Sequence, residues 1–591
     1  AASDVYKRQV NSILRRIMIL ETLKGPKDLK QLNIEQLNGL AQEIRDALMF
    51  KLTKKGGHVG PNFGMVEMEI ALHYVFDSPV DKIIYDISHQ TYPHKMLTGR
   101  QQAFLDEDHF ADISGYTNPE ESSHDHFMLG HTSTSISLAS GMAKARDLAH
   151  RDENIIAIMG DGSLSGGEAL EGLNVCGSEL SSNMIIIIND NQQSIAENHG
   201  GLYENLAQLH ATNGECENNL FKAMGLDYLY VNQGNDIQIL INVFNQVKDI
   251  DHPIVLHINT IKGKGFDLAE TNKEPWHYHG PFSLAEQDNN SQPSVSYASI
   301  TSDFLLEEMK KDEKVVVVTP GVPGAFGFDQ TKRKQAGKQF VDVGIAEQQA
   351  TSMVTGLAQN GAKPVLISSV TFMQRAVDQI SHDMCLNNVP ATILLNGGSL
   401  NAFRDATHLG IFGISMFSHI PNLVLLAPTN VEEYLSMLKY SIHQTKHPVM
   451  ILLPGNGLVY SNKPVDTNYD NINQYQVTHQ GSDIAIIAAG GFYQYGEALL
   501  EAINQELGIN PTLINPRFLS GLDKDLLEQL KANHQLVITI EDGIKEGGFG
   551  SNIASFYGPS LVKVINYGVD KVFYDRFDPQ QLLIDNGMSI D

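Results

Sequence analysis

Short apolar runs that end in polar residues recur along the chain, and each is followed by a segment with helical periodicity. Examples are "NIIAIMGDG", "NMIIIINDN", "KVVVVTP", "KPVLISS" and "DIAIIAAGG". Runs without polar alternation indicate strands buried on both faces, and the intervening helices cover those faces. The pattern predicts an α/β protein with three consecutive doubly wound domains and mainly parallel sheets.

Polar segments divide this alternation into three blocks. The chain of 591 residues is too long for one hydrophobic core. One polar segment covers 283–299, and another follows "HPVMILLPGNG". We therefore expect domains at 10–285, 300–460 and 475–591. The opening "AASDVYKRQ" fits nothing after it and is interpreted as an artefact of cloning or sequence assembly.

Charge and cysteine usage exclude several classes of protein. The formal net charge is -27, from 42 basic and 69 acidic residues, which disfavours binding to nucleic acid or anionic membranes. A negatively charged metabolite must therefore bind through a metal ion, helix N-termini or a few converging basic residues. The three cysteines are widely separated, which argues against a disulfide framework and favours the cytoplasm. No apolar stretch is long enough to span a membrane.

Two of the predicted strands end on ligands that suit a hard cation. Asp161 follows the first strand in "MGDG", and Asn191 follows the next in "INDN". The carboxyl ends of parallel strands share one sheet edge, so both side chains, with the backbone carbonyl of Gln193, could hold one Mg²⁺. Protein-bound Mg²⁺ usually keeps phosphate ligands. The glycines at 160, 162, 166 and 167 would let the backbone approach a diphosphate.

Several longer stretches extend this pattern over nearly the whole chain. They include "GGHVGPNFGMVEMEIALHYVF", "YDISHQTYPHKMLTGR", "GHTSTSISLASGMAKA", "DVGIAEQQA", "TFMQRAVDQISHD", "THLGIFG" and "IEDGIKEGGFGS". In these stretches the chain resembles thiamine diphosphate enzymes of the transketolase superfamily, and within it the 1-deoxy-D-xylulose-5-phosphate synthase family. The resemblance implies a transketolase-like fold, a homodimer, and thiamine diphosphate with Mg²⁺ as cofactors. It also implies a transferase that joins pyruvate to glyceraldehyde 3-phosphate with decarboxylation, for isoprenoid, thiamine and pyridoxal synthesis.

The resemblance assigns the cofactor contacts to particular residues. Glu347 would hydrogen-bond the aminopyrimidine ring, and Phe372 would stack on it. Phe266 stands where the family usually has tyrosine. The remaining assigned contacts are His89, Gly130, His131, Thr132, Asp161, Gly162, Ser163 and Asn191.

Four residues are assigned to catalysis by the same resemblance. His58 and His408 match histidines at the reacting carbonyls, where imidazole can exchange protons. His279 is a weaker match because His277 lies two residues away. Glu347 completes the set.

The departures from the family cluster at the acceptor's phosphate. The family holds that phosphate with one arginine in "DRAG" and another in "YPRGN", where this chain has "LLNGGS" and "LLPGNG". We expect Arg375, Arg404 and Asp405 to contact the substrate instead. The alternatives are a paralogous ketol or acyloin transferase with another, perhaps unphosphorylated, acceptor, and a cofactor-binding protein with little activity.

Overall fold

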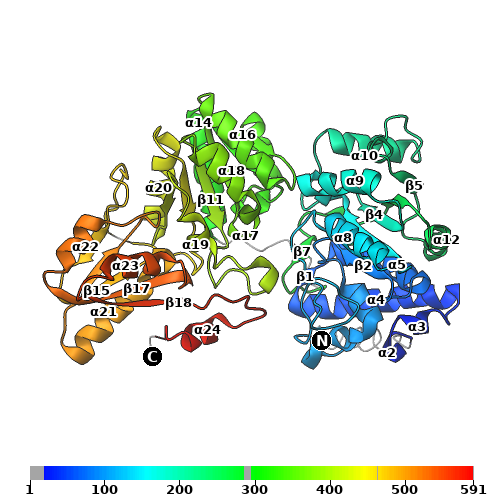
Figure 1. Ribbon diagram of the computed structural model, residues 1–591, viewed down its shortest axis with the longest axis horizontal. Coiled ribbons are helices and arrows are strands. Elements are labelled where there is room, and N and C mark those ends of the chain that lie inside the picture. Colours follow the sequence, from blue (N-terminus) through cyan, green and yellow to red (C-terminus); the bar gives the residue numbers. More distant parts are fainter. Residues whose placement is uncertain (1–18, 285–294, 462, 590–591) are drawn as a thin grey trace. The chain divides into compact units, whose positions relative to one another are not determined.

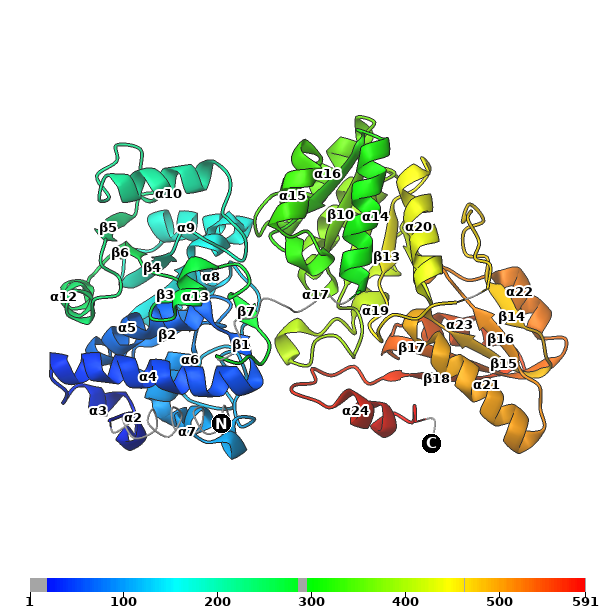
Figure 2. The same ribbon diagram turned by 180° about the vertical axis from the view of Figure 1, so that it is seen from behind.

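The computed structural model describes residues 19–284, 295–461 and 463–589. The chain divides into two units, residues 1–291 and 292–591 (Figures 1 and 2). The opening nine residues and positions 285–294 of the expected linker lie outside the described residues. Among the helices of the described part, none has the length and apolar content that crossing a membrane requires.

The first unit is built on a five-stranded parallel sheet in the order β2-β3-β4-β6-β5. The strands are β2 (Lys82–Tyr85), β3 (Ile155–Gly160), β4 (Met184–Asp190), β5 (Asp227–Val231) and β6 (Pro253–Asn259). Ile156 and Ile158 of β3 pack into one core with α4 (Ile34–Lys55), α5 (Gly60–Val75) and α12 (Ile237–Val247). Ala157 and Met159 face the opposite core with α8 (Ser135–Leu148), α9 (Gly167–Glu179) and α10 (Gly201–Ala211). Both faces are therefore covered, as the unbroken apolar runs predict.

The second unit contains a six-stranded parallel sheet in the order β12-β13-β11-β10-β8-β9. Its strands are β8 (Val315–Thr319), β9 (Phe340–Asp342), β10 (Lys363–Ser369), β11 (Thr392–Asn396), β12 (Val424–Leu426) and β13 (Val449–Leu452). One face packs on α14 (Tyr297–Lys311) and α20 (Val431–His443), and the other on α16 (Glu347–Gln359).

A further five-stranded sheet of the second unit has the order β14-β16-β15-β17-β18. Its strands are β14 (Gln476–His479), β15 (Asp483–Ala488), β16 (Thr512–Asn515), β17 (His534–Ile544) and β18 (Lys563–Val569), with β14 antiparallel to β16. Its longer helices are α21 (Tyr493–Leu507), α22 (Lys524–Leu530), α23 (Phe549–Tyr557) and α24 (Pro579–Asp585). Three mainly parallel sheets with covering helices follow one another along the chain, which confirms the predicted fold class. The exact domain limits stay a prediction.

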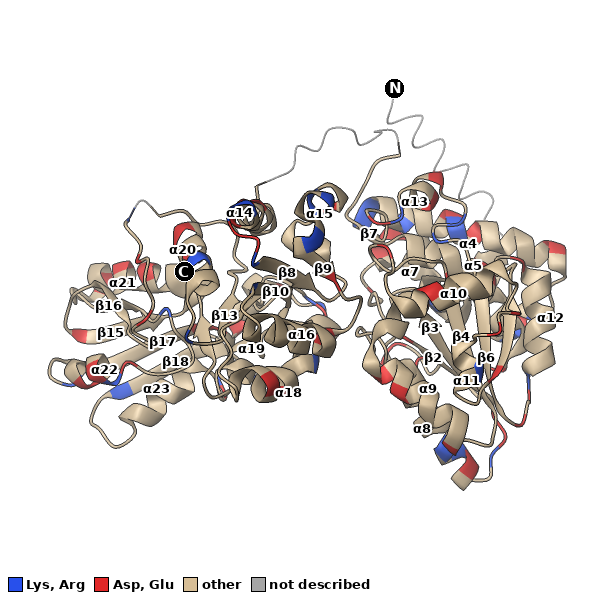
Figure 3. Cartoon of the chain, turned by 90° about the horizontal axis from the view of Figure 1, so that it is seen from above, with Lys and Arg blue, Asp and Glu red and all other residues tan. Residues whose placement is uncertain are grey.

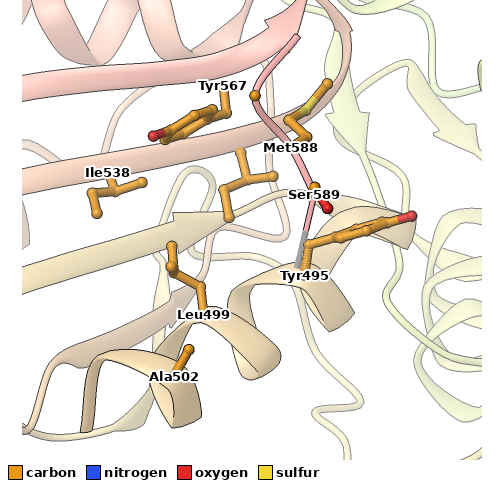
Figure 4. Close-up of a pocket in the computed structure, with 9 residues that line it drawn as sticks. Tyr495, Leu499, Ala502, Ile538, Tyr567, Met588 and Ser589 are labelled. Carbon is orange, nitrogen blue, oxygen red and sulfur yellow. The ribbon is translucent and has the colours of Figure 1, made fainter. Parts of the chain in front are cut away.

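Short helices connect these elements: α2 (Ile19–Thr22), α3 (Pro26–Leu29), α7 (Gln102–Leu105), α11 (Leu220–Ala223), α15 (Gln330–Ala336), α18 (Val377–Gln379) and α19 (Gly413–Phe417). Acidic and basic side chains are scattered over most elements (Figure 3). An apolar pocket lies between α21, β17 and β18, with Tyr495 and Leu499 on the helix and Tyr567 on β18 (Figure 4). Ile540, which opens the stretch "IEDGIKEGGFGS", also lines this pocket.

Candidate functional site

The two predicted cation ligands follow neighbouring strands. β3 and β4 pair in parallel, with Gly160 opposite Asn189, so Asp161 and Asn191 leave the sheet at the same edge. Asp161 is buried and accepts a hydrogen bond from Asn198 Nδ2 over 2.7 Å. The side-chain oxygen of Asn191 is buried and has no hydrogen-bond partner among the described residues. A buried, unsatisfied oxygen beside a carboxyl group fits the ligand set of Mg²⁺.

The electrostatics of this edge call for a cation as well. Burial and the neighbouring Asp190 raise the pKa of Asp161 well above its ordinary value. Burial alone would raise the pKa of Asp190 too, but hydrogen bonds from His210 and His257 lower it. Asp190 therefore keeps its charge, whereas the charge of Lys262 only partly offsets the raised pKa of Asp161. Sequence reasoning missed Asp190, although it stands between the two asparagines of "NDN".

Lys262 is a buried cation at this edge that the sequence analysis also missed. Its Nζ donates to the Ser194 carbonyl and lies 3.0 Å from His277 Nδ1. Burial lowers its pKa to about 7, and the charge of Asp161 acts in the opposite direction. A buried ammonium group of this kind suits an anionic ligand such as a diphosphate. The motif "KGKGF" was the available signal, but only Phe266 was taken from it.

The glycine-rich turn and the "GHTSTS" loop lie against each other. The turn is η3 (Asp161–Ser165), and Ser133 Oγ donates to the Ser163 carbonyl over 2.8 Å. A Cβ at Gly162 would lie 2.8 Å from the Ser194 side chain, so only glycine fits there. Buried Asp86 accepts hydrogen bonds from the amides of residues 133, 134 and 135, which fixes the loop at the start of α8. The predicted residues Gly130, His131, Thr132, Gly162 and Ser163 are thus brought together.

Three histidines gather beside this loop. The ring of His89 lies 4.8 Å from that of His58 and is stacked at 5.2 Å on that of His277. Asn62 fixes the two predicted members, because its Nδ2 donates to the carbonyls of both His58 and His89 over 2.8 Å. Ser88 precedes His89 with a φ of 67, a strained conformation of the kind found at functional sites.

His279 and Phe266 are placed differently from this cluster. His279 lies on β7 (Tyr278–His279), which pairs with β1 (Gly57–His58), and its ring stacks on Trp276 at 4.6 Å. Phe266, just before α13 (Asp267–Thr271), packs edge-on against the same tryptophan at 4.9 Å. The structure thus brings His277, rather than His279, next to His58. Gln193 lies just beyond Asn191, with its Nε2 3.3 Å from the Ile195 carbonyl.

In the second unit, Glu347 is the first residue of α16 and is 3% exposed. Burial raises the pKa of its carboxyl group, and Arg375 counteracts this in part. Arg375 lies in η6 (Gln374–Ala376) with Nη1 3.2 Å from Glu347 Oε2. The predicted substrate ligand Arg375 therefore faces the predicted proton-handling acid.

Phe372 and His408 lie together, as the resemblance implies. Phe372 is in α17 (Val370–Met373), and its ring meets the His408 ring edge-on at 5.7 Å. His408 ends η8 (Ala406–His408), and its Nδ1 lies 3.1 Å from Asp405 Oδ1. Burial alone would raise the pKa of Asp405, but the hydrogen bond and charge of His408 lower it. The Thr407 hydroxyl lies 2.8 Å from the same Nδ1, and with the ionised carboxylate as acceptor the imidazole proton is on Nδ1 and the lone pair on Nε2.

The two segments that lack the family's arginines are closely packed around glycines. Gly397 has a φ of +72, and a Cβ there would lie 2.7 Å from the Phe403 ring. A Cβ at Gly455 would lie 2.1 Å from that of Ser399. Neighbouring side chains therefore fill the space that a larger residue would need. Arg404 is exposed in the loop before η8.

Models of known protein families match almost the whole chain. A family model described as 1-deoxy-D-xylulose-5-phosphate synthase matches residues 20–217 and 208–260. The transketolase pyrimidine binding domain matches 293–458, and the transketolase C-terminal domain matches 473–584.

Full-length relatives carry the same name as the first family model. The 1-deoxy-D-xylulose-5-phosphate synthase 1 of Geobacter sulfurreducens is 36% identical, with 96% of this chain and 95% of the relative covered. The synthase of Clostridium beijerinckii is also 36% identical, over 95% of this chain and 96% of the relative. Among solved structures, transketolase from Campylobacter jejuni is 16% identical with a TM-score of 0.43, covering 95% of this chain and 98% of its own.

Proposed function

The chain belongs to the 1-deoxy-D-xylulose-5-phosphate synthase family, and we propose that it condenses pyruvate with glyceraldehyde 3-phosphate to 1-deoxy-D-xylulose 5-phosphate. The reaction releases CO₂ and depends on thiamine diphosphate and Mg²⁺. The observation that supports it most directly is that buried Asp161 and the unsatisfied oxygen of Asn191 follow two paired parallel strands at the same sheet edge. The alternative of a paralogous transferase is not favoured, because the relatives named above carry the synthase name.

The cofactor's diphosphate and metal would be held by the first unit. Asp161 and Asn191 would supply oxygen ligands to Mg²⁺, with the carbonyl of Gln193 as a third. Lys262 would face the diphosphate, because it is a buried cation near Asp161. His89, Gly162 and Ser163 would border the same space, together with Gly130, His131 and Thr132; the contact of Ser133 with Ser163 supports this arrangement.

Thiamine diphosphate supplies the nucleophilic carbon and the electron sink for decarboxylation and carbon–carbon bond formation. Glu347 would hold a proton at the pyrimidine ring, since burial favours its protonated form. Phe372 would give that ring an aromatic face. Phe266 would add apolar packing.

His408 and His58 would exchange protons with the reacting carbonyls. In the orientation set by Asp405, His408 presents Nε2 as the basic nitrogen. The ring of His58 contacts the stacked rings of His89 and His277. Of the two candidates near the end of the first unit, His277 has the stronger geometric support. A catalytic role for His279 stays a prediction.

The acceptor's phosphate would be bound by Arg404. Arg375 is engaged with Glu347, whereas Arg404 is exposed next to the loop that carries Asp405 and His408. We also propose a homodimer and a cytoplasmic location; the three cysteines are free thiols. The domains would span 10–285, 300–460 and 475–591.

The test is product analysis with pyruvate and glyceraldehyde 3-phosphate in the presence of Mg²⁺ and thiamine diphosphate. We expect CO₂ release that the phosphorylated aldehyde stimulates, with 1-deoxy-D-xylulose 5-phosphate as the product. Release that this aldehyde does not stimulate would point to another acceptor. No release from the folded holoenzyme would contradict the proposal.

A further inference from the structure

Four side chains with metal-ligating atoms meet in the interior of the first unit, and none is part of the proposed cofactor site. Glu69 and His73 lie one turn apart on α5, which places them on the same helix face. Tyr85 ends β2, and His94 lies in α6 (Tyr92–Lys95). All four are at most 2% exposed.

The ligand atoms of this cluster have spacings close to those around a tetrahedral zinc ion. Tyr85 Oη lies 2.7 Å from Glu69 Oε2 and 3.1 Å from His94 Nδ1. His73 Nε2 lies 2.9 Å from His94 Nδ1 and 4.0 Å from Glu69 Oε2. Ligands of a tetrahedral zinc are about 3.3 Å apart, so a central ion needs shifts of roughly half an ångström.

An outer hydrogen-bond network orients one of the imidazoles. His94 Nε2 lies 2.8 Å from Asp125 Oδ1, and Arg100 pairs with the same carboxylate through contacts of 2.7 and 2.9 Å. Burial alone would raise the pKa of Asp125, but these partners lower it, so the carboxylate accepts the Nε2 proton. The lone pair of His94 is then on Nδ1, which faces the cluster. Zinc-bound histidines commonly show this carboxylate–histidine arrangement.

The hydrogen bonds within the cluster leave two polar atoms of its side chains unsatisfied. Glu69 Oε1 and His73 Nδ1 are buried and have no hydrogen-bond partner among the described residues. The Tyr85 hydroxyl donates to Glu69 Oε2, so the lone pair of His94 Nδ1 faces His73 Nε2 and the centre of the cluster. Such unsatisfied buried groups call for an explanation.

We propose that Glu69, His73, Tyr85 and His94 bind a structural zinc ion, separate from the magnesium of the cofactor site. The two imidazole lone pairs, the ionised Glu69 carboxylate and the Tyr85 oxygen occupy the four positions. Any proton held by these ligands passes to solvent when the metal binds, and no redox partner is needed.

A second cluster in the same unit provides the contrast. Asp190 Oδ2 lies 2.8 Å from Nε2 of both His210 and His257. The Nδ1 atoms of these histidines face the hydroxyls of Tyr230 and Tyr228 at 2.7 and 2.8 Å. Each ring nitrogen here has a partner, so this network is complete without an ion.

The experiment measures metal content of the full-length chain. The protein is expressed in medium that contains zinc and is then dialysed against Mg²⁺ and thiamine diphosphate. Its metal content is measured by inductively coupled plasma mass spectrometry. We expect about one zinc per chain in the wild type and in His210→Gln, and less than about a tenth in Glu69→Gln. A zinc-free wild type, zinc retained by Glu69→Gln, or zinc lost from His210→Gln would each overturn the proposal.

A second variant covers the case in which Glu69→Gln does not fold. Asp125→Asn keeps the four proposed ligands but alters the carboxylate that His94 shares with Arg100, and it should weaken zinc affinity about 10- to 100-fold in competition with a chelator. Asp147→Asn, which alters a partly exposed carboxylate paired with Arg146, should leave the affinity unchanged. Equal affinities of Asp125→Asn and the wild type would contradict the site.

Discussion

Asp405 Oδ1 lies 3.1 Å from Nδ1 of His408, in a loop that departs from the family and in which the sequence predicts that Asp405 contacts the substrate. The same loop is anchored at the next residue, because the Ala406 amide donates to Asp575 over 3.0 Å. In the proposed mechanism the carboxylate would act on the substrate through the imidazole, by fixing its tautomer and orientation. Asp405 is a positioning residue in this arrangement.

Asp405→Asn should lower kcat about 100-fold, because an amide can donate to Nδ1 and stabilise the wrong tautomer. The KM for pyruvate should change little, since the carboxylate does not contact it. Asp405→Glu should recover part of the rate, which a purely structural role in loop folding would not predict. Equal kcat/KM values for the wild type and Asp405→Asn would contradict the pairing.

A site residue could be predicted from the sequence where its role follows from its position at the end of a strand. Asp161 and Asn191 were found because apolar strands end at them, and parallel strands share their carboxyl edge. The partner of His408 could not be found in this way, because η8 sets it and no periodicity marks so short a turn. The same holds for Lys262, whose burial depends on residues distant in the sequence.

The choice between His277 and His279 illustrates the same limit. β7 pairs with β1 so that His58 lies opposite Tyr278, and this register decides which histidine reaches the cluster. Two residues of strand carry too little pattern to specify a register. The series of three mainly parallel α/β sheets, in contrast, follows from long apolar strands that repeat along the chain, and this fold class was predicted correctly.

Asp161→Ala should abolish tight binding of the cofactor with Mg²⁺, with a loss of affinity of at least about 100-fold. Isothermal titration calorimetry with both ligands measures this without turnover. Asp147→Asn is a suitable control, since it removes a carboxylate of the same unit that pairs with Arg146. Unchanged binding heat in Asp161→Ala would remove the basis of the proposed site.

Glu347→Gln should lower kcat by about 100- to 10,000-fold, because the amide cannot exchange the required proton. It should also raise the Tm of the cofactor-free protein at neutral pH. Burial raises the pKa of Glu347 above its ordinary 4.5, so the folded state binds this proton more tightly than the unfolded chain does. The carboxylate therefore destabilises the folded state as pH rises above 4.5, and the gain should disappear below that pH.

The matched control for Glu347→Gln is Glu433→Gln. Glu433 is also buried with a raised pKa, but it accepts hydrogen bonds from Thr429 and Asn515. Its replacement should lower Tm, since it removes satisfied hydrogen bonds. If Glu347→Gln destabilised the protein as Glu433→Gln does, the carboxylate would be structural.

Gly455→Ala should destabilise the second unit by about 1–3 kcal/mol, since the new Cβ would lie 2.1 Å from that of Ser399. Ser399→Gly should restore much of this loss in the double variant, because it removes the clashing atom. Gly356→Ala in α16 is the control: no heavy atom lies within 4 Å of its Cβ position, and helix propensity favours alanine. Additive effects of Gly455→Ala and Ser399→Gly in chemical denaturation would show that the two residues do not compete for space.

Arg404→Ala should raise the KM for glyceraldehyde 3-phosphate about 10- to 100-fold, the effect of losing a charge-assisted hydrogen bond. The KM for pyruvate and the affinity for thiamine diphosphate should stay near their wild-type values, because neither ligand presents its charge to this loop in the proposed arrangement. The KM of Arg404→Lys for glyceraldehyde 3-phosphate should lie between those of the wild type and Arg404→Ala, since lysine keeps the charge but loses the planar fork. Lys439→Ala removes an exposed cation from α20 in the same unit and should leave all three parameters unchanged. An unchanged KM in Arg404→Ala would mean that another cation binds the phosphate, and Arg375 would then be the next residue to replace.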